Sequence, residues 1–117
     1  MSTYSKQLLS ASSNGQPIPI TATATLGTLV HQSLLTGAVD EVWLWLVNRS
    51  SAAVTVTVEW GAAGNANHLV EAYSIPANSI PIEVSAGQLI QAGLQVTIFA
   101  STANAINAIG FVNRITG

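Results

Sequence analysis

The chain has 117 residues, of which three are Lys or Arg and five are Asp or Glu, for a formal net charge of −2. Charged residues make up 7% of the sequence, against about 25% in an average soluble domain. Three basic side chains cannot neutralise even about six phosphates, so we expect no nucleic-acid partner. The absence of cysteine excludes disulfides, thiolate metal sites and a cysteine nucleophile.

The surface of such a chain must consist largely of Ser, Thr, Asn, Gln and Ala, whereas a free monomer normally needs a charged surface to stay dispersed. Neutral side chains cost little to desolvate, which suits a subunit packed against copies of itself or against other proteins. No apolar run approaches the roughly 18 residues of a membrane span, the longest being 42–47. Residues 1–16 also lack the apolar core of a secretion signal. We therefore expect no membrane association.

The N-terminal part of the chain combines a polar segment with the first expected strands. Residues 1–17 are Ser-rich, and we expect either a loosely ordered tail or an arm that reaches a neighbouring subunit through Leu8 and Leu9. Residues 20–26 alternate Ile, Ala or Leu with Thr, which predicts a half-buried strand. A second strand is expected over residues 28–35.

The middle of the chain carries its most regular patterns. Residues 41–48 are apolar on both faces of an expected strand, with Val and Leu side chains on one face and Trp43, Trp45 and Val47 on the other. Residues 53–60 show the cleanest alternation, with valines inward and Thr and Glu side chains outward. A polar turn separates the two segments, so they predict a hairpin.

The C-terminal half contains shorter signals. Strands are expected over residues 69–75, 81–84 (at an edge, because of its proline), 89–90, 94–100 and 105–115. The last segment changes phase near Gly110, which suggests a β-bulge or a bend.

About eight short strands separated by Gly, Pro and Asn turns predict an all-β fold, namely a two-sheet antiparallel β-sandwich. The spacing of the strands leaves open whether the connections are immunoglobulin-like or those of a jelly roll. The expected organisation is an N-terminal arm over residues 1–17 and one sandwich domain over residues 18–117.

No motif in the sequence indicates catalysis, a cofactor or a metal. There is no G-x-S-x-G elbow and no H-E-x-x-H pair. His68 and Glu71 are close in sequence, but a spacing of three in a strand predicts side chains on opposite faces. We expect His31 and His68 at strand edges or interfaces. The acidic residues, Glu59 among them, are expected to be solvated or paired with an arginine. The chain is therefore predicted not to be an enzyme.

The aromatic residues allow several interpretations. Trp60 is in phase with the valines of its strand and is expected in the core. Trp43 and Trp45 share the opposite face of their strand, where they are covered within the chain, lie at a subunit interface, or form an exposed platform for a ligand. Phe99 is the out-of-phase aromatic of residues 94–100. The candidate interface residues are Leu8, Leu9, Trp43, Trp45 and Phe99.

Three segments carry a resemblance to a known family: D-E-V-W-L-W-L-V-N-R-S-S-A-A-V-T-V-T-V-E-W-G (40–61), S-I-P-A-N-S (74–79) and L-Q-V-T-I-F-A-S-T-A-N-A-I-N-A-I-G-F-V-N-R-I (94–115). Their acidic pair before a W-x-W strand, I-P-A-N turn and C-terminal F-V-N-R-I resemble small structural proteins encoded among the virion genes of tailed bacteriophages. The resemblance covers most of residues 26–115.

The resemblance implies a β-sandwich that assembles in many copies on a phage particle after synthesis in the host cytoplasm. We expect a capsid decoration (cement) protein that binds the major capsid protein or another virion protein, as a homo-oligomer and conceivably as a trimer. Two alternatives stay open, an accessory protein of the tail, baseplate or connector and a carbohydrate-binding module for host attachment.

Overall fold

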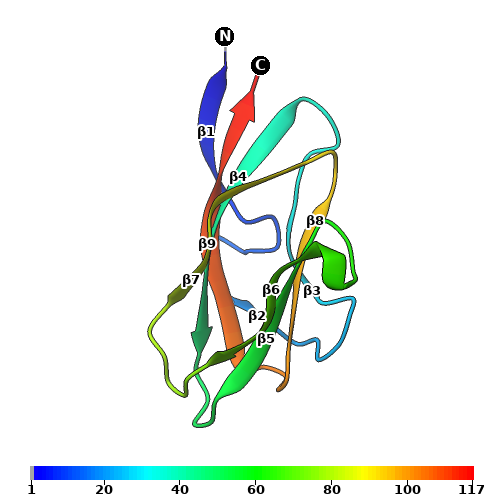
Figure 1. Cartoon of the computed structure of the whole chain (residues 1–117). Coiled ribbons are helices and arrows are strands. Elements are labelled where there is room, and N and C mark those ends of the chain that lie inside the picture. The colour runs from blue at the N-terminus through cyan, green and yellow to red at the C-terminus, as the bar shows by residue number, and fades with distance from the viewer. Residues whose placement is uncertain (1) are drawn as a thin grey trace.

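The computed structural model describes residues 2–117, which form nine β-strands and one short 3-10 helix, Asn65–Asn67 (Figure 1). The strands are β1 Thr3–Leu8, β2 Ile18–Pro19, β3 Thr28–Gln32, β4 Ala38–Asn48, β5 Val54–Trp60, β6 His68–Ile75, β7 Ile82–Gln91, β8 Gln95–Ala100 and β9 Ile106–Thr116. No helix in this part of the chain is long and apolar enough to cross a membrane.

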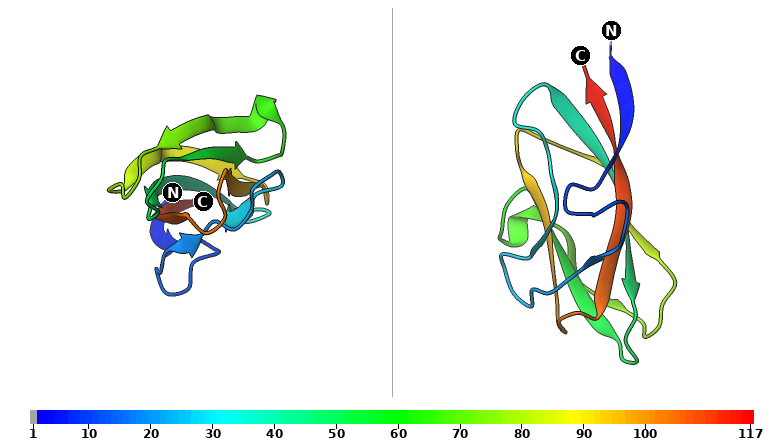
Figure 2. Two further views of the ribbon diagram at one scale, coloured as in Figure 1. Left: turned by 90° about the horizontal axis from the view of Figure 1, so that it is seen from below. Right: turned by 180° about the vertical axis from the view of Figure 1, so that it is seen from behind.

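The strands form two antiparallel sheets that pack against each other, which confirms the predicted two-sheet β-sandwich (Figure 2). The first sheet has the order β1-β9-β4-β7, with β2 also paired to β9. The second has the order β3-β8-β5-β6. The start of β1 and the end of β9 lie side by side at one end of the sandwich (Figure 1).

The pairing of the strands is nested from the outside of the sequence to its middle. β1 and β2 pair with β9, β3 pairs with β8, β4 with β7, and β5 with β6. This is the pairing of one long hairpin rolled up so that its strands fall into two sheets, which defines a jelly roll. The strand order therefore decides between the two topologies that the sequence left open.

The predicted hairpin of residues 41–48 and 53–60 is wrong. β4 lies between β9 and β7 in the first sheet, whereas β5 lies between β8 and β6 in the second. Both strands bury a set of alternate apolar side chains, and two such sets in opposite sheets can pack on each other across the core. Period-two alternation fixes which face of a strand is buried but does not fix its partner.

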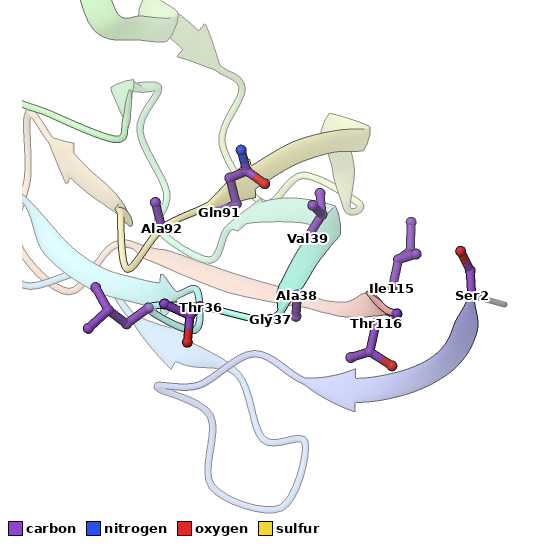
Figure 3. A pocket seen from close by; sticks show the side chains of 11 residues that line it. Ser2, Thr36, Gly37, Ala38, Val39, Gln91, Ala92, Ile115 and Thr116 are labelled. Atoms are coloured by element: carbon purple, nitrogen blue, oxygen red, sulfur yellow. The ribbon is translucent and has the colours of Figure 1, made fainter.

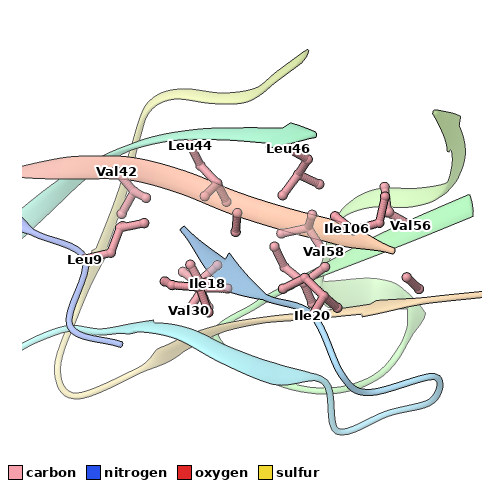
Figure 4. Close-up of a cluster of buried hydrophobic side chains, with 14 of the residues drawn as sticks. Leu9, Ile18, Ile20, Val30, Val42, Leu44, Leu46, Val56, Val58 and Ile106 are labelled. Atoms are coloured by element: carbon pink, nitrogen blue, oxygen red, sulfur yellow. The ribbon is translucent and has the colours of Figure 1, made fainter. Parts of the chain in front are cut away.

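The core is one cluster of apolar side chains between the sheets (Figure 4). Its largest fully buried members are Leu9, Ile20, Leu44, Leu46, Ile75, Ile98, Ile106, Val30, Val42 and Val54. Trp60, expected in the core, packs against this cluster but stays partly exposed.

The segment 1–17, expected as an arm, contributes to the sandwich itself. β1 pairs with β9 over six residue pairs at the margin of the first sheet. Leu9 is only 1% exposed and belongs to the core cluster, so it is anchored within its own chain. Residues that precede the expected domain boundary at 17/18 are thus part of the first sheet.

Two further expectations differ from the structure. Residues 20–26 form an irregular loop, in which the backbone N–H groups of Thr21 and Ala22 donate to Thr28 Oγ1 and so have no strand partner. β9 runs past Gly110 without a change of register. A Cβ at Gly110 would lie 2.0 Å from the backbone oxygen of Trp43, so the missing side chain permits close pairing with β4.

Candidate functional site

An aromatic cluster lies on the outer face of the first sheet. Trp43 and Trp45 of β4 point away from the core and stack with Phe111 of β9, at centroid distances of 6.1 and 6.2 Å. The ammonium group of Lys6, on β1, lies 4.8 Å from the centroid of the Phe111 ring. A cation over an aromatic face is attracted by the ring quadrupole, so Lys6 ties β1 to the cluster.

The cluster is only partly covered by its own chain, since Trp43, Trp45 and Phe111 all remain partly exposed. The bulge of β7 at Gly87 brings backbone against the indole, because a Cβ there would lie 3.1 Å from Trp43 Cζ2. Lys6 contacts the Phe111 ring, and Phe111 stacks with Trp43, so part of each of these rings is covered by other residues of the same chain.

The remaining interface candidates fall in different places. Leu8 is 51% exposed on β1, beside the aromatic cluster and opposite Phe111. Leu9 is buried and unavailable to a partner in the folded chain. Phe99 lies partly exposed on the second sheet, where its ring meets the edge of His68 at a centroid distance of 6.4 Å. The structure thus groups Leu8 with Trp43 and Trp45, and places Phe99 elsewhere.

An exposed leucine cluster lies at the end of the sandwich where the termini meet. We call Leu34, Leu35, Leu89 and Leu94 the end patch; their exposed fractions are 44%, 75%, 57% and 48%. Two open hollows of about 350 and 330 Å³ adjoin it and share Val39 and Gln91, and Figure 3 shows the first of them. No side chain that lines the two hollows carries a charge, so the side chains at this end form an apolar surface with a few neutral polar groups.

A buried ion-pair network lies below this end. His31 Nε2 is 2.7 Å from Asp40 Oδ2, and Arg114 donates to both oxygens of Asp40 at 2.9 and 3.1 Å. The pairing of Asp40 with an arginine confirms that expectation. His31 lies on β3, an edge strand of the second sheet as expected, but its side chain is fully buried.

The protonation of this network follows from its hydrogen bonds. The backbone N–H of Ser10 donates to His31 Nδ1 at 3.0 Å, so Nδ1 carries no proton and Nε2–H donates to Asp40. Burial lowers the pKa of His31 although the Asp40 carboxylate acts in the opposite direction. Burial acts to raise the pKa of Asp40, but hydrogen bonds from Arg114 and His31 outweigh it and hold that pKa below its ordinary value.

Glu59 is a second buried acid, which corrects the expectation of a solvated or arginine-paired side chain. It is fully buried and accepts hydrogen bonds from Thr25 Oγ1, from the backbone N–H of Gly27 at 2.8 Å and from Thr97 Oγ1 at 2.7 Å. Burial acts to raise the pKa of Glu59, yet these hydrogen bonds outweigh it and lower that pKa. The carboxylate fixes the loop before β3 onto the second sheet and has a structural role.

His68 and Glu71 lie on the same side of β6, contrary to the prediction from their spacing. Two register shifts between β5 and β6 break the alternation, and His68 Nδ1 lies 3.0 Å from Glu71 Oε2.

The described residues contain no group of three or more His, Asp or Glu side chains that could hold a metal ion.

Sequence reasoning missed Phe111 and the end patch. Phe111 follows the alternation of β9 once Gly110 is counted as an inward position between Ala108 and Val112. That signal was present but hidden by a residue without a side chain. The end patch has no local signal, because its leucines come from the connection after β3, from β7 near its end and from the turn before β8.

The comparisons with known proteins add no identity to this geometry: no family model matches the chain, and no curated protein or solved structure was found to match it.

Proposed function

We propose that the chain is a structural subunit of a tailed-bacteriophage particle, a decoration protein that docks on the outside of the capsid and bridges neighbouring capsid subunits. The observation that supports this proposal most is the end patch, four exposed leucines beside two hollows that no charged side chain lines. Monomeric proteins seldom leave a contiguous apolar surface without a partner. The resemblance of residues 40–61 and 94–115 to small virion proteins supports the choice of a phage particle.

The low charge of the chain favours the same role. Charged residues make up 7% of the sequence, so few ions must lose their water when a large part of the surface is covered. Burial of an exposed leucine side chain contributes roughly 1.5–3 kcal/mol before the cost of association. The end patch therefore supplies apolar contact, and the surrounding Ser, Thr and Asn side chains allow close approach.

The mechanism of a decoration protein is thermodynamic. A ligand that binds an assembled state and not the separated subunits stabilises the assembly by mass action. Each copy that contacts two capsid subunits would oppose their separation, and no catalytic group or cofactor takes part.

Binding to particles tests the proposal. Purified protein is mixed with expanded empty capsids and, separately, with capsid-free tails, and the bound fraction is measured by co-sedimentation. We expect binding to capsids and at least a tenfold loss of affinity for Leu35→Asp and Leu89→Asp. Ile80→Asp is the matched control, because Ile80 is 80% exposed in the connection between β6 and β7, away from the end patch.

The results separate the proposal from its nearest rival. Failure of the wild-type protein to bind capsids contradicts a decoration role, and binding to tails alone supports a tail or baseplate accessory protein. Equal binding by Leu35→Asp, Leu89→Asp and Ile80→Asp contradicts docking through the end patch. Near-UV circular dichroism establishes that each variant is folded.

A second candidate function is carbohydrate binding for host attachment, which the partly exposed pair Trp43 and Trp45 favours. Here Trp43→Ala and Trp45→Ala should abolish retention on immobilised host glycans while the protein remains folded. If the variants unfold or the wild-type protein is not retained, the cluster is structural and the decoration role is preferred.

A further inference from the structure

The sandwich has four main free edges, and three of them are irregular. β3, β6 and β7 each have their register shifted against their single neighbour, so each carries at least one bulge. Bulges at an edge strand prevent another chain from pairing with it. β1 differs, because its register with β9 is unbroken from Thr3 opposite Thr116 to Leu8 opposite Phe111.

The side chains of β1 leave its outer edge open. Tyr4, Lys6 and Leu8 lie on the outer face of the first sheet, opposite Ile115, Asn113 and Phe111. A lysine often protects an edge strand from pairing, but the Lys6 ammonium is held over the Phe111 ring, on the face of the sheet. β1 forms the margin of the molecule in both side views (Figures 1 and 2).

We propose that β1 pairs antiparallel with β1 of a second copy of the chain, so that the two first sheets join into one continuous sheet. An edge strand of six residues with an unbroken register presents regularly spaced backbone donors and acceptors to such a partner. The inference rests on the proposed function only in its choice of a second copy, since decoration proteins work as repeated subunits.

The side chains select one register for this pairing. With Ser5 opposite Ser5 of the second copy, each Lys6 lies opposite a Tyr4, so no two like charges face each other. A shift of two residues toward the C-terminus places Lys6 opposite Lys6, and like charges directly opposite are destabilising. The same shift toward the N-terminus places Tyr4 opposite Tyr4 and shortens the overlap of the two β1 strands. A shift of one residue turns the outer side chains of one copy toward the inner side of the other. The register centred on Ser5 is therefore preferred.

The pairing has a consequence for the outer face. A two-fold axis perpendicular to the sheet keeps both aromatic clusters on the same side, so that Trp43, Trp45 and Phe111 of two copies line one extended surface. One pair of strands covers less than the roughly 1,600 Å² of a standard protein interface. We therefore expect weak association in dilute solution and stronger association where copies are concentrated on a particle.

Cysteine crosslinking tests the pairing, and the chain contains no cysteine of its own. In Ser5→Cys the two introduced thiols lie directly opposite each other, and the separation of about 4.5–5.5 Å between opposed Cα atoms permits a disulfide. The control is Gln7→Cys, on the same side of the same strand, whose thiols are offset by four residues, about 13 Å along the strands. Both variants are incubated with oxidised glutathione at increasing protein concentration.

We expect a disulfide-linked dimer of Ser5→Cys, with at least fivefold less dimer for Gln7→Cys at every concentration. Absence of crosslinking in Ser5→Cys, or equal crosslinking in both variants, overturns the proposal. Thermal unfolding of the reduced variants checks that both are folded. A protein that binds capsids but does not crosslink rejects the β1 pairing alone, and one that crosslinks but binds no particle rejects the decoration role alone.

Discussion

Individual buried polar residues attach loops of this protein to its sheets. Glu59 holds the loop before β3, and His31 holds the segment after β1 through the backbone N–H of Ser10. Asp40 and Arg114 complete the His31 network from β4 and β9. Loss of one partner from such a network leaves the others buried without a hydrogen bond, which costs about 1–3 kcal/mol for each group. These residues therefore determine where the irregular segments lie.

The first prediction concerns two neighbouring leucines. Leu9 is 1% exposed and Leu8 is 51% exposed. Leu9→Ala creates a cavity in the core and should lower the free energy of unfolding by about 2–5 kcal/mol. Leu8→Ala removes a surface contact and should lower it by less than about 1 kcal/mol. Urea unfolding measures both values. If the two variants lose equal free energy of unfolding, the burial of Leu9 is contradicted and both leucines become interface candidates again.

The second prediction concerns acid. The unfolded chain binds a proton at His31 near pH 6.5, whereas the folded chain binds it only at a lower pH. Between these values the unfolded state holds the extra proton, so the free energy of unfolding falls as the pH falls, by at most about 1.4 kcal/mol per pH unit. The lowered pKa of Asp40 adds a further loss of stability in more acidic solution, beginning near pH 3.8.

Thermal unfolding at pH 7.5, 6.5 and 5.5 measures this dependence. We expect the wild-type melting temperature to fall less between pH 7.5 and 6.5 than between pH 6.5 and 5.5, while His31→Asn starts lower and changes less over the whole range. His68→Asn is the control, since it leaves the network of His31 intact and should keep the wild-type slope. If the melting temperature of His31→Asn falls with pH as steeply as that of the wild type, groups other than His31 cause the acid sensitivity.

At the scale of the strand, the central pair β4 and β9 organises the first sheet. The two strands pair over eleven positions, from Ala38 opposite Thr116 to Asn48 opposite Ile106. Their outer faces carry the aromatic cluster, and their inner faces carry a large part of the core. The close approach at Gly110 is a condition for this pairing.

The third prediction tests that approach. A Cβ in Gly110→Ala would lie 2.0 Å from the Trp43 backbone oxygen, so the strands must separate locally. We expect a loss of more than about 3 kcal/mol and altered tryptophan fluorescence. In Gly37→Ala the added atom meets nothing within 4 Å, and the positive φ of +87° should cost about 1–2 kcal/mol. Similar losses in both variants would contradict the close contact.

The strands also show what the sequence could predict. The inward faces of β4, β5 and β8 followed from alternation, because the valine, leucine and isoleucine rows are regular. The partners of β4 and β5 did not follow, since alternation carries no information on pairing. The alternation of residues 20–26 failed as a strand signal because Thr28 Oγ1 accepts hydrogen bonds from the backbone N–H groups of Thr21 and Ala22.

For the whole molecule, the composition predicted a surface with few charges, and the structure shows where its exposed aromatic and leucine side chains lie. The alternation placed Trp43 and Trp45 on one face, but it could not bring Lys6, Phe111 and the leucines of the end patch together. Those residues are distant in sequence and meet only through the jelly-roll connections. A scarcity of charge, an exposed leucine cluster and an unbroken edge strand are the three features on which the proposed contact with other proteins rests.

Electron cryo-microscopy of intact particles that contain the chain tests this account most directly. It predicts jelly-roll density repeated over the outer surface of the capsid, with the end patch against capsid protein and the leucines Leu35 and Leu89 covered. Density in which both the end patch and the aromatic face are turned to solvent in every copy would contradict it.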